Sequence, residues 1–256
     1  MENIKNMRDY NMTISLLMPF FNRESVISEA IESALSQTFK DFEFILLNDG
    51  STDDSDSIVK SYMKKDDRIR YLHNSKNKGI NFSRNYLVRE SSHNIIAWID
   101  SDDVISDNKL ESQLGVMKEC DADIVVSNYV FFKHGQSLLS KSLRSRIVSC
   151  DVETINKNKI FSGNENFCFA SNMCKKEVLV DNLFRENITA GGDSVWVNDV
   201  LRHHSFHSDQ NSVYYIRRHN QRISFKKRYE SCISSGRNPE NNPWIKSNNI
   251  SIGGQI

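Results

Sequence analysis

The sequence predicts an α/β protein with a Rossmann-like, mostly parallel central sheet flanked by helices. Three observations lead to this expectation. Short apolar runs alternate with segments of helical periodicity through the first half of the chain. Four of these runs end in polar or glycine-bearing segments. The chain has 256 residues, enough for one large domain with a proper core. Such alternation implies parallel strands joined by right-handed crossovers.

Four apolar runs in the first half have the length and composition of buried strands. The first ends in a proline, and the second and fourth end in aspartate. The runs are 13–19 (TISLLMP), 42–49 (FEFILLND), 68–74 (RIRYLHN) and 94–100 (NIIAWID). In such sheets ligands bind outside the carboxyl ends of the strands, so we expect the segments "MPFFN", "NDGSTDD", "HNSKNKG" and "DSDD" to form one rim.

The segments between these runs carry apolar residues at helical spacing. Helices are expected over about 26–35, with Asn22 or Ser25 as the cap, then through 58–63 and over 81–91. After the fourth run the same periodicity predicts a helix through Leu110, Leu114 and Met117, and then a strand over 121–132.

The second half is less regular. Residues from about 133 to 165 are polar and weakly periodic, which predicts loops with short elements. Regular structure is expected again over 166–179 and in a helix from about 193 to 202. From 217 the chain is basic, and its last ~25 residues are rich in Ser, Asn, Gly and Pro, a composition typical of a mobile tail.

Composition restricts the function classes. The 33 basic and 33 acidic residues cancel, so no overall field favours nucleic acid or an acidic substrate. Five cysteines, an odd number without CxxC spacing, predict reduced thiols in a cytoplasmic protein. No apolar run approaches the roughly 20 residues that span a bilayer. Any membrane contact is therefore expected to be peripheral.

The segment "AWIDSDDVIS" places Asp100, Asp102 and Asp103 at the end of an apolar run. Hard divalent cations such as Mg²⁺ or Mn²⁺ take one or two carboxylates together with substrate phosphates. The competing interpretation is a solvated loop in which Asp103 or Asp107 caps the next helix. A calcium loop is a third interpretation, and the sequence disfavours it. Such a loop needs an oxygen ligand where Val104 stands and glycine where Ile105 stands, and it needs a helix upstream, where a strand is expected.

Five segments follow one another along the chain: "SLLMPFFNRESVISEAIESALSQTFKDFEFILLNDGSTDDS", "NKGINFSRN", "IIAWIDSDD", "FASNMCKKEVLVDNLFRENITAGGDSVWVNDVL" and "VYYIRRHNQRIS". In this order they resemble the family 2 glycosyltransferases, which have the GT-A fold. The resemblance covers roughly residues 13 to 225. The resemblance implies a nucleotide-sugar-binding half over 1–104, an acceptor-binding and catalytic half over 105–216, and a basic C-terminal lid or tail over 217–256.

The resemblance also implies a donor site. Asp49 would accept a hydrogen bond from the uracil imide, and Asp102 would ligate Mn²⁺ or Mg²⁺ directly. Asp103 is either a second-layer contact of the metal or a helix cap. The remaining residues implied to contact the nucleotide sugar are Pro19, Asn22, Arg84, Asp100, Ser101 and Arg218.

His219 would complete the metal shell, or it would close over the diphosphate together with Arg217, Arg218 and Arg222. Two other interpretations of the basic stretch remain open: contact with anionic lipid, and a plain solvated face.

The family's general base is the aspartate of an acidic pair at the start of a helix. Here the segment reads Gly191-Gly192-Asp193, so only the second acid is present. The resemblance assigns the base to Asp193, with a simple helix cap as the alternative. Asp199 is the next candidate. Gly192 would adjoin the acceptor, and Trp196 would stack on an acceptor sugar or belong to the core.

The expected function is an inverting, metal-dependent glycosyltransferase acting on a UDP-hexose. The acceptor would be a glycan or a lipid-diphosphate-linked sugar of O-antigen, capsule or another surface glycan, reached from the inner face of the membrane. Two alternatives stay open. One is a nucleotidyltransferase, although "MPFFNRES" lacks a phosphate-binding glycine. The other is a non-catalytic sugar-nucleotide-binding protein, which Gly192 favours.

Overall fold

The computed structural model describes residues 12–133, 135–138, 140–159, 161, 166–188 and 191–218. The predicted strands and helices of the first half are present, with bounds that shift by a few residues at most. The strands are β1 (Ile14–Phe20), β2 (Phe42–Asn48), β3 (Ile69–His73) and β4 (Ile95–Trp98). The helices between them are α1 (Ile27–Leu35), α2 (Ser55–Met63) and α3 (Ile80–Glu90). The cap prediction was wrong, because Val26 precedes α1 and makes no side-chain cap.

The remaining elements complete the sheet and cover it. They are β5 (Val104–Ile105), α4 (Lys109–Cys120), β6 (Ile124–Lys133), α5 (Lys141–Arg144), α6 (Val152–Asn158), η1 (Phe169–Ser171), β7 (Asn172–Lys175), α7 (Lys176–Asp181), α8 (Gly192–Val200) and β8 (Phe206–Arg218). Asn108 precedes α4, so neither Asp103 nor Asp107 caps that helix.

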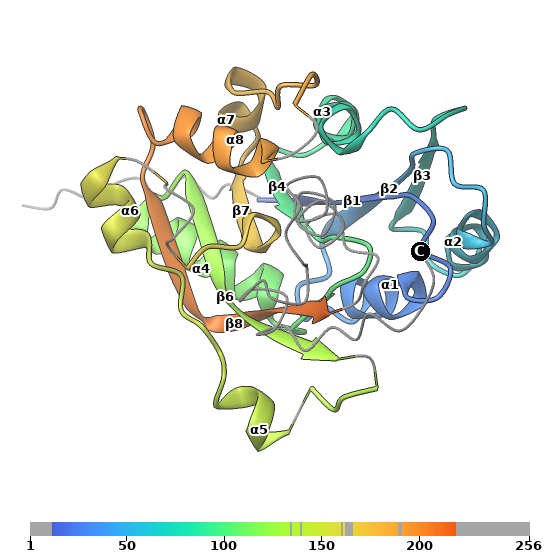
Figure 1. Cartoon of the computed structure of the whole chain (residues 1–256), viewed down its shortest axis with the longest axis horizontal. Helices are drawn as coiled ribbons and strands as arrows, with labels where there is room; N and C mark the ends of the chain where they lie inside the picture. Colours follow the sequence, from blue (N-terminus) through green and yellow to red (C-terminus); the bar gives the residue numbers. More distant parts are fainter. Residues whose placement is uncertain are drawn as a thin grey trace, which may run out of the picture.

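One eight-stranded sheet runs through both halves of the chain, in the order β3-β2-β1-β4-β7-β6-β8-β5. The β1, β2, β3 and β4 pairings are parallel, and so is β6 with β8. β7 is antiparallel to both β4 and β6, and β5 is antiparallel to β8. Helices α1 and α2 lie together on one side of the sheet, and α3 lies on the other beside α7 (Figure 1). The expected α/β architecture is confirmed.

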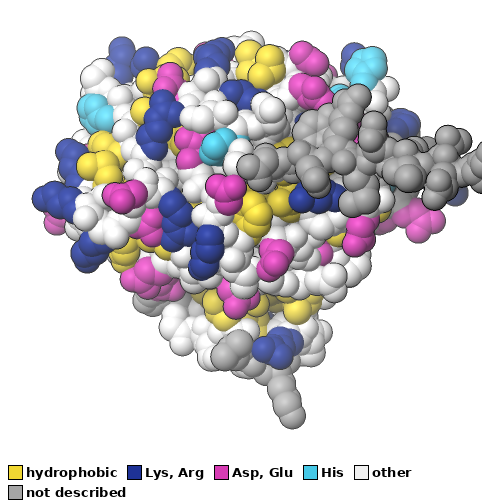
Figure 2. Space-filling model, turned by 180° about the vertical axis from the view of Figure 1, so that it is seen from behind, with side chains coloured by type: hydrophobic (Ala, Val, Ile, Leu, Met, Phe, Trp, Pro, Cys, Tyr) yellow, Lys and Arg dark blue, Asp and Glu magenta, His cyan; other side chains and the backbone are white. Residues whose placement is uncertain are grey.

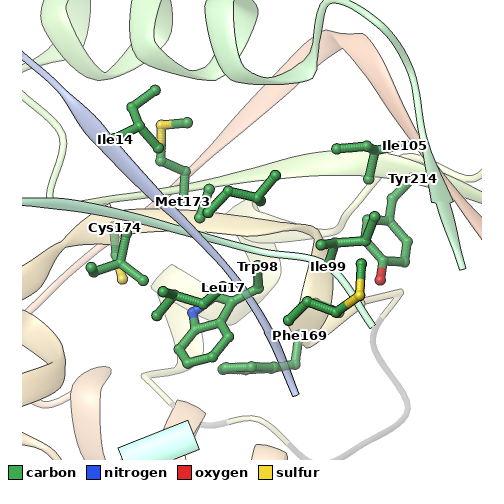
Figure 3. Packing of buried hydrophobic residues seen from close by; sticks show 14 of the residues in the cluster. Ile14, Leu17, Trp98, Ile99, Ile105, Phe169, Met173, Cys174 and Tyr214 are labelled. Carbon is green, nitrogen blue, oxygen red and sulfur yellow. The ribbon is translucent and has the colours of Figure 1, made fainter. Parts of the chain in front are cut away.

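The core forms between the sheet and these helices. All seven residues of β1 are buried, as expected for a parallel strand covered on both faces. Buried side chains from β1, β4, β5, β7 and β8 belong to one cluster (Figure 3). In it the ring centroid of Trp98 lies 5.9 Å from that of Phe169. Tyr214 of β8 is fully buried in the same cluster. On the surface, acidic and basic side chains are interspersed over the face seen in Figure 2.

Strand β8 was not predicted from the sequence. Its centre reads Ser208-Asp209-Gln210-Asn211-Ser212, which resembles a loop. The structure buries Asp209 and Ser212 inside the strand, where the Ser112 hydroxyl donates to Asp209 at 2.7 Å and Ser127 lies 2.7 Å from Ser212. These side-chain hydrogen bonds offset the cost of burying polar groups.

Candidate functional site

The three acids after β4 form a cluster at the carboxyl end of the strand. One carboxylate oxygen from each of Asp100, Asp102 and Asp103 lies within 4.8 Å of the others. The Asp103 N–H donates to the Asp100 carbonyl at 3.1 Å, which closes a tight turn. Asp102 and Asp103 are buried, and Asp100 is half-buried. Closely spaced carboxylates repel one another, and an all-oxygen set fits Mg²⁺ or Mn²⁺.

Two arginines approach this acid cluster (Asp100, Asp102 and Asp103) from other parts of the chain. Arg23 Nε lies 3.7 Å from Asp102 Oδ2, and Arg84 Nη2 lies 3.8 Å from Asp100 Oδ1. Arg23 follows β1, whereas Arg84 belongs to α3. The cluster therefore lies where the ends of β1 and β4 meet α3.

Strand β8 supports the same turn from the other side. The Arg217 N–H donates to Asp103 Oδ1 at 2.8 Å, and its Nε donates to the Asp102 carbonyl at 2.9 Å. Its Nη2 reaches Glu29 Oε2 at 2.7 Å. The sequence predicts Arg217 at the start of a basic lid, a lipid contact or a solvated face, but its side chain is only 1% exposed. A positioning role for this residue could not be predicted without β8.

Tyr214 fixes the start of the turn. Its hydroxyl oxygen accepts a hydrogen bond from the Asp100 N–H at 2.8 Å. Burial, followed by the charges of Asp103 and Asp100, raises the pKa of Tyr214 well above its usual value. The hydroxyl therefore stays protonated at any physiological pH.

Arg84 joins the acid cluster to Asp193. Its Nη1 forms an ion pair and hydrogen bond with Asp193 Oδ1, while Nη2 faces Asp100. Its guanidinium carbon lies 4.4 Å from the ring centroid of Phe169 and 5.2 Å from that of Phe184. Burial alone would lower the pKa of Arg84, but the charges of Asp193 and Asp100 raise it overall. One buried guanidinium thus holds Asp193 on the same side of the molecule as the acid cluster.

Asp193 lies in the first turn of α8, after Gly191 at the N-cap. The capping alternative is therefore not what the structure has. The Asp193 side chain is 50% exposed, unlike that of its partner Arg84 at 5%. Asp199, the second candidate for the base, instead pairs with Arg185 at 2.9 Å. Asp193 is the carboxylate on α8 that combines access to solvent with contact to the site.

Gly192 permits a close approach between α8 and α3. A Cβ at this position would lie 2.6 Å from the side-chain oxygen and nitrogen of Asn81. The Asn81 amide donates to the carbonyls of Arg185 and Ile188 at 3.0 and 2.8 Å. Any larger residue at 192 would displace that amide, so the space of the missing first acid is filled by Asn81. Sequence reasoning did not identify Asn81.

The predicted rim does come together beside the ends of β1 and β2. Asn22 has a left-handed φ of 50°, and its Oδ1 accepts from the Thr52 N–H at 2.8 Å. Asp49 is buried and accepts three hydrogen bonds, from the Asn74 side chain and the N–H groups of Lys78 and Gly79, at 2.8 to 2.9 Å. Its carboxylate therefore anchors the loop after β3. Contact with uracil remains a prediction.

The remaining residues predicted to bind the nucleotide sugar or the metal do not all lie beside the acid cluster. Pro19 is buried in β1, and Ser101 is buried in the acidic turn. The guanidinium of Arg218 lies 4.8 Å from the ring centroid of Phe131, at the far end of β8. His219 lies outside the described residues.

Of the two alternatives for Trp196, stacking on an acceptor sugar is wrong. The residue is 2% exposed, its ring stacks on Phe184 at 5.8 Å between centroids, and it meets Phe169 edge-on at 5.3 Å. An indole enclosed in this way offers no open face to a sugar. Trp196 belongs to the core.

Comparison with known sequences finds a family model and several bacterial relatives that match this chain. The sequence model described as "Glycosyl transferase family 2" matches residues 15–182. An uncharacterized glycosyltransferase of Rickettsia bellii is 34% identical over 194 residues, which is 72% of this chain and 26% of the relative. The "GalNAc(5)-diNAcBac-PP-undecaprenol beta-1,3-glucosyltransferase" of Campylobacter jejuni is 31% identical over 186 residues, 72% of this chain and 59% of the relative. The minor teichoic acid biosynthesis protein GgaB of Bacillus subtilis is 30% identical over 203 residues, 77% of this chain and 22% of the relative. The chain thus spans between about a fifth and three fifths of these relatives.

Solved structures that share the GT-A fold with this chain include S. aureus TarS and the mannosyltransferase PcManGT. S. aureus TarS in complex with UDP-GlcNAc superposes with a TM-score of 0.65 at 19% identity, covering 82% of this chain and 60% of that one. The mannosyltransferase PcManGT from Pyrobaculum calidifontis, in complex with GDP-Man and Mn²⁺, has a TM-score of 0.62 at 14% identity, covering 86% and 60%.

Proposed function

Because this chain belongs to glycosyltransferase family 2, we propose that it moves a hexose from a UDP-sugar to a sugar acceptor with inversion. The observation that carries the proposal is the contact of Arg84 with both Asp193 and Asp100. It sets a half-exposed carboxylate beside a cluster of three acids, which is the arrangement that a general base and a metal-bound leaving group require.

The acid cluster would hold Mn²⁺ or Mg²⁺, with Asp102 as the direct ligand and Asp100 next to the ribose or a metal-bound water. When bound, the cation supplies Lewis-acid stabilisation of the departing diphosphate. The chain's own part is to hold the ligands rigidly. Tyr214 and Arg217 do so through the backbone of the turn, at 2.8 Å from the Asp100 nitrogen and 2.9 Å from the Asp102 oxygen.

Asp193 would take the proton from the acceptor hydroxyl as that oxygen attacks the anomeric carbon. Arg84 binds Asp193 Oδ1, so we assign Oδ2 to the acceptor. Attack from the side opposite the leaving diphosphate inverts the anomeric centre. Arg84 acts here as a positioning residue, because it fixes the base relative to the acid cluster.

The proposed donor and acceptor are supported by the names of similar proteins. The UDP-GlcNAc complex of TarS supports a UDP-sugar donor. The names of the Campylobacter glucosyltransferase and of GgaB support a bacterial surface glycan as acceptor, carried on a lipid diphosphate in the first case. Among the described residues, no helix combines the length and hydropathy needed to cross a bilayer. We propose that the chain works at the inner face of the membrane, with 1–104 binding the donor and 105–216 the acceptor.

The test is release of UDP from a panel of UDP-sugars, with Mn²⁺ or with EDTA. We expect slow acceptor-independent release with one donor in Mn²⁺ and none in EDTA. Asp102→Asn should abolish it and weaken Mn²⁺-dependent UDP binding by about tenfold or more. The matched control is Asp107→Asn, because Asp107 is an exposed acid just beyond the cluster. Donor binding without turnover on any acceptor would indicate a non-catalytic binder, and release of pyrophosphate would indicate a nucleotidyltransferase.

A further inference from the structure

Strands β6 and β8 run parallel and end side by side (Figure 1). A cavity of about 430 Å³ lies at these strand ends. Phe131 and Phe132 line it, together with the turn that follows β6. Three basic residues complete the lining: Lys133, Arg146 and Arg218. The described residues that line this cavity include no acid.

Arg146 is close enough to Arg218 for its charge to act on that side chain. Burial, followed by the charge of Arg146, lowers the pKa of Arg218. The Arg218 guanidinium carbon lies over the Phe131 ring, 4.8 Å from its centroid, and its buried Nε has no hydrogen-bond partner among the described residues. Contact with the ring restrains the guanidinium, whose planar fork binds phosphate oxygens in pairs. An anion between Arg146 and Arg218 would receive charge-assisted hydrogen bonds from both guanidinium groups.

This cavity differs from the place of the donor's diphosphate. Successive residues of a strand point to opposite faces, and Arg217 points to Asp102 and Asp103. Arg218 therefore points away from the side on which Arg217 contacts the acid cluster. Arg217 itself lies over Phe132, 4.6 Å from the ring centroid, and Phe132 also lines the cavity, so the cavity adjoins a residue that contacts the acid cluster. An anion bound there is well placed to belong to the second substrate.

We propose that this cavity binds a phosphate or diphosphate group of the acceptor. The inference rests on the proposed function and adds a chemical requirement to it: the acceptor carries a phosphate ester. A diphosphate suits the cavity because it offers several negative oxygens to three cations in a volume typical of small-ligand sites. The expectation that Arg218 closes over the donor's diphosphate is replaced by this assignment.

The probe is inorganic pyrophosphate, titrated calorimetrically against the full chain in EDTA. Without a cation the acid cluster repels an anion, so binding reports on the basic cavity. We expect wild type to bind, and Arg146→Gln and Arg218→Gln each to weaken binding about tenfold. Arg202→Gln is the matched control, because Arg202 is an exposed arginine outside the cavity. Its affinity for pyrophosphate should equal that of wild type.

Two further arms separate the possible failures. In Mn²⁺, UDP should bind wild type and Arg146→Gln equally. Normal UDP binding with no pyrophosphate binding, or with equal binding by all variants, would refute the cavity assignment alone. Absence of UDP binding would refute the proposed function and the acceptor assignment with it. Vesicles of phosphatidylglycerol that bind through Arg146 while pyrophosphate does not would make the cavity a bilayer contact, which also overturns the proposal.

Discussion

Arg84 concentrates the electrostatics of the site in one side chain. A buried guanidinium is costly unless it is paired, and here two carboxylates and two aromatic rings surround it. Asp193 on α8 and Asp100 after β4 are 93 positions apart in the sequence and share this partner. Arg84 therefore links the position of α8 to that of the acid cluster.

The variant Asp193→Asn tests whether Asp193 is the general base. The amide keeps the shape of the side chain and an oxygen for Arg84, but it cannot take a proton. We expect the transfer rate to fall by about 10²- to 10⁴-fold while Mn²⁺-dependent UDP affinity changes by less than about threefold. Initial rates at saturating donor and calorimetric titration of UDP give the two quantities.

Asp199→Asn is the matched control, because Asp199 lies on the same helix and pairs with Arg185 outside the site. It should retain transfer. An equal loss of UDP affinity and transfer in Asp193→Asn would instead make Asp193 a structural residue.

The local sequence was enough to predict the three acids of the cluster, but not the residues that contact them in the folded protein. Three aspartates in four positions form a signal within the sequence itself, and the structure gathers them as expected. Arg217 and Asn81 act through backbone atoms of segments more than 100 positions away, and no local pattern encodes such a partner. Trp196 gives the reverse case, because an aromatic residue on a helix has the same pattern whether its ring faces a ligand or the core.

At the scale of elements, the junction of α8 with α3 determines where Asp193 lies. Gly192 contacts the Asn81 side chain so closely that a methyl group there has no room. We predict that Gly192→Ala destabilises the fold by about 1 to 3 kcal/mol. In the Gly192→Ala/Asn81→Ala double variant the loss should be smaller than the sum of the two single losses, because the clash is gone.

Urea denaturation measures these differences, and Gly115→Ala provides the matched control. Gly115 lies inside α4, and a Cβ there meets nothing within 4 Å. Alanine at that helical position should stabilise the protein by about 0.5 to 1 kcal/mol. Additive losses in the double variant, or stabilisation by Gly192→Ala, would contradict the close approach.

The elements of the first half were predictable because each strand is a continuous apolar run and each helix has its own period. β8 was not, because its polar centre is buried through hydrogen bonds to Ser112 and Ser127, which come from α4 and β6. Burial of that kind depends on tertiary partners. The omission mattered for the site, since β8 carries Tyr214 and Arg217 to the acidic turn.

At the scale of the whole molecule, the sheet places the last described strand against the first half of the chain. β8 pairs with β6 and with the short β5, which directly follows the acid cluster. The fold is therefore closed around the site by residues from both ends of the described chain. Global stability and the geometry of the site are coupled through this closure.

Lys109 on α4 is a fully buried amine. It lies in the first turn of α4, is 0% exposed, and donates from Nζ to Gln113 Oε1 at 2.8 Å. Burial lowers the pKa of Lys109 to about 7, although the charge of Asp209 opposes the shift. In the unfolded chain a lysine titrates near pH ~10.4. Between these values the unfolded state binds one more proton than the folded state.

The free energy of unfolding contributed by Lys109 therefore rises with pH from about 7 to about 10, and below pH 7 the penalty is complete and constant. Lys109→Met removes this dependence. We predict that the stability of Lys109→Met relative to wild type is highest below pH 7 and falls by about 1 to 4 kcal/mol as the pH approaches 10. The loss of a donor to Gln113 costs about 1 to 3 kcal/mol at every pH, so the slope rather than the absolute difference is the readout.

Urea denaturation at pH 6, 8 and 9.5 measures how the free energy of unfolding depends on pH in each variant. The control is Lys118→Met, because Lys118 is an exposed lysine on the same helix. Parallel curves for the two variants would show that Lys109 keeps its charge in the folded protein.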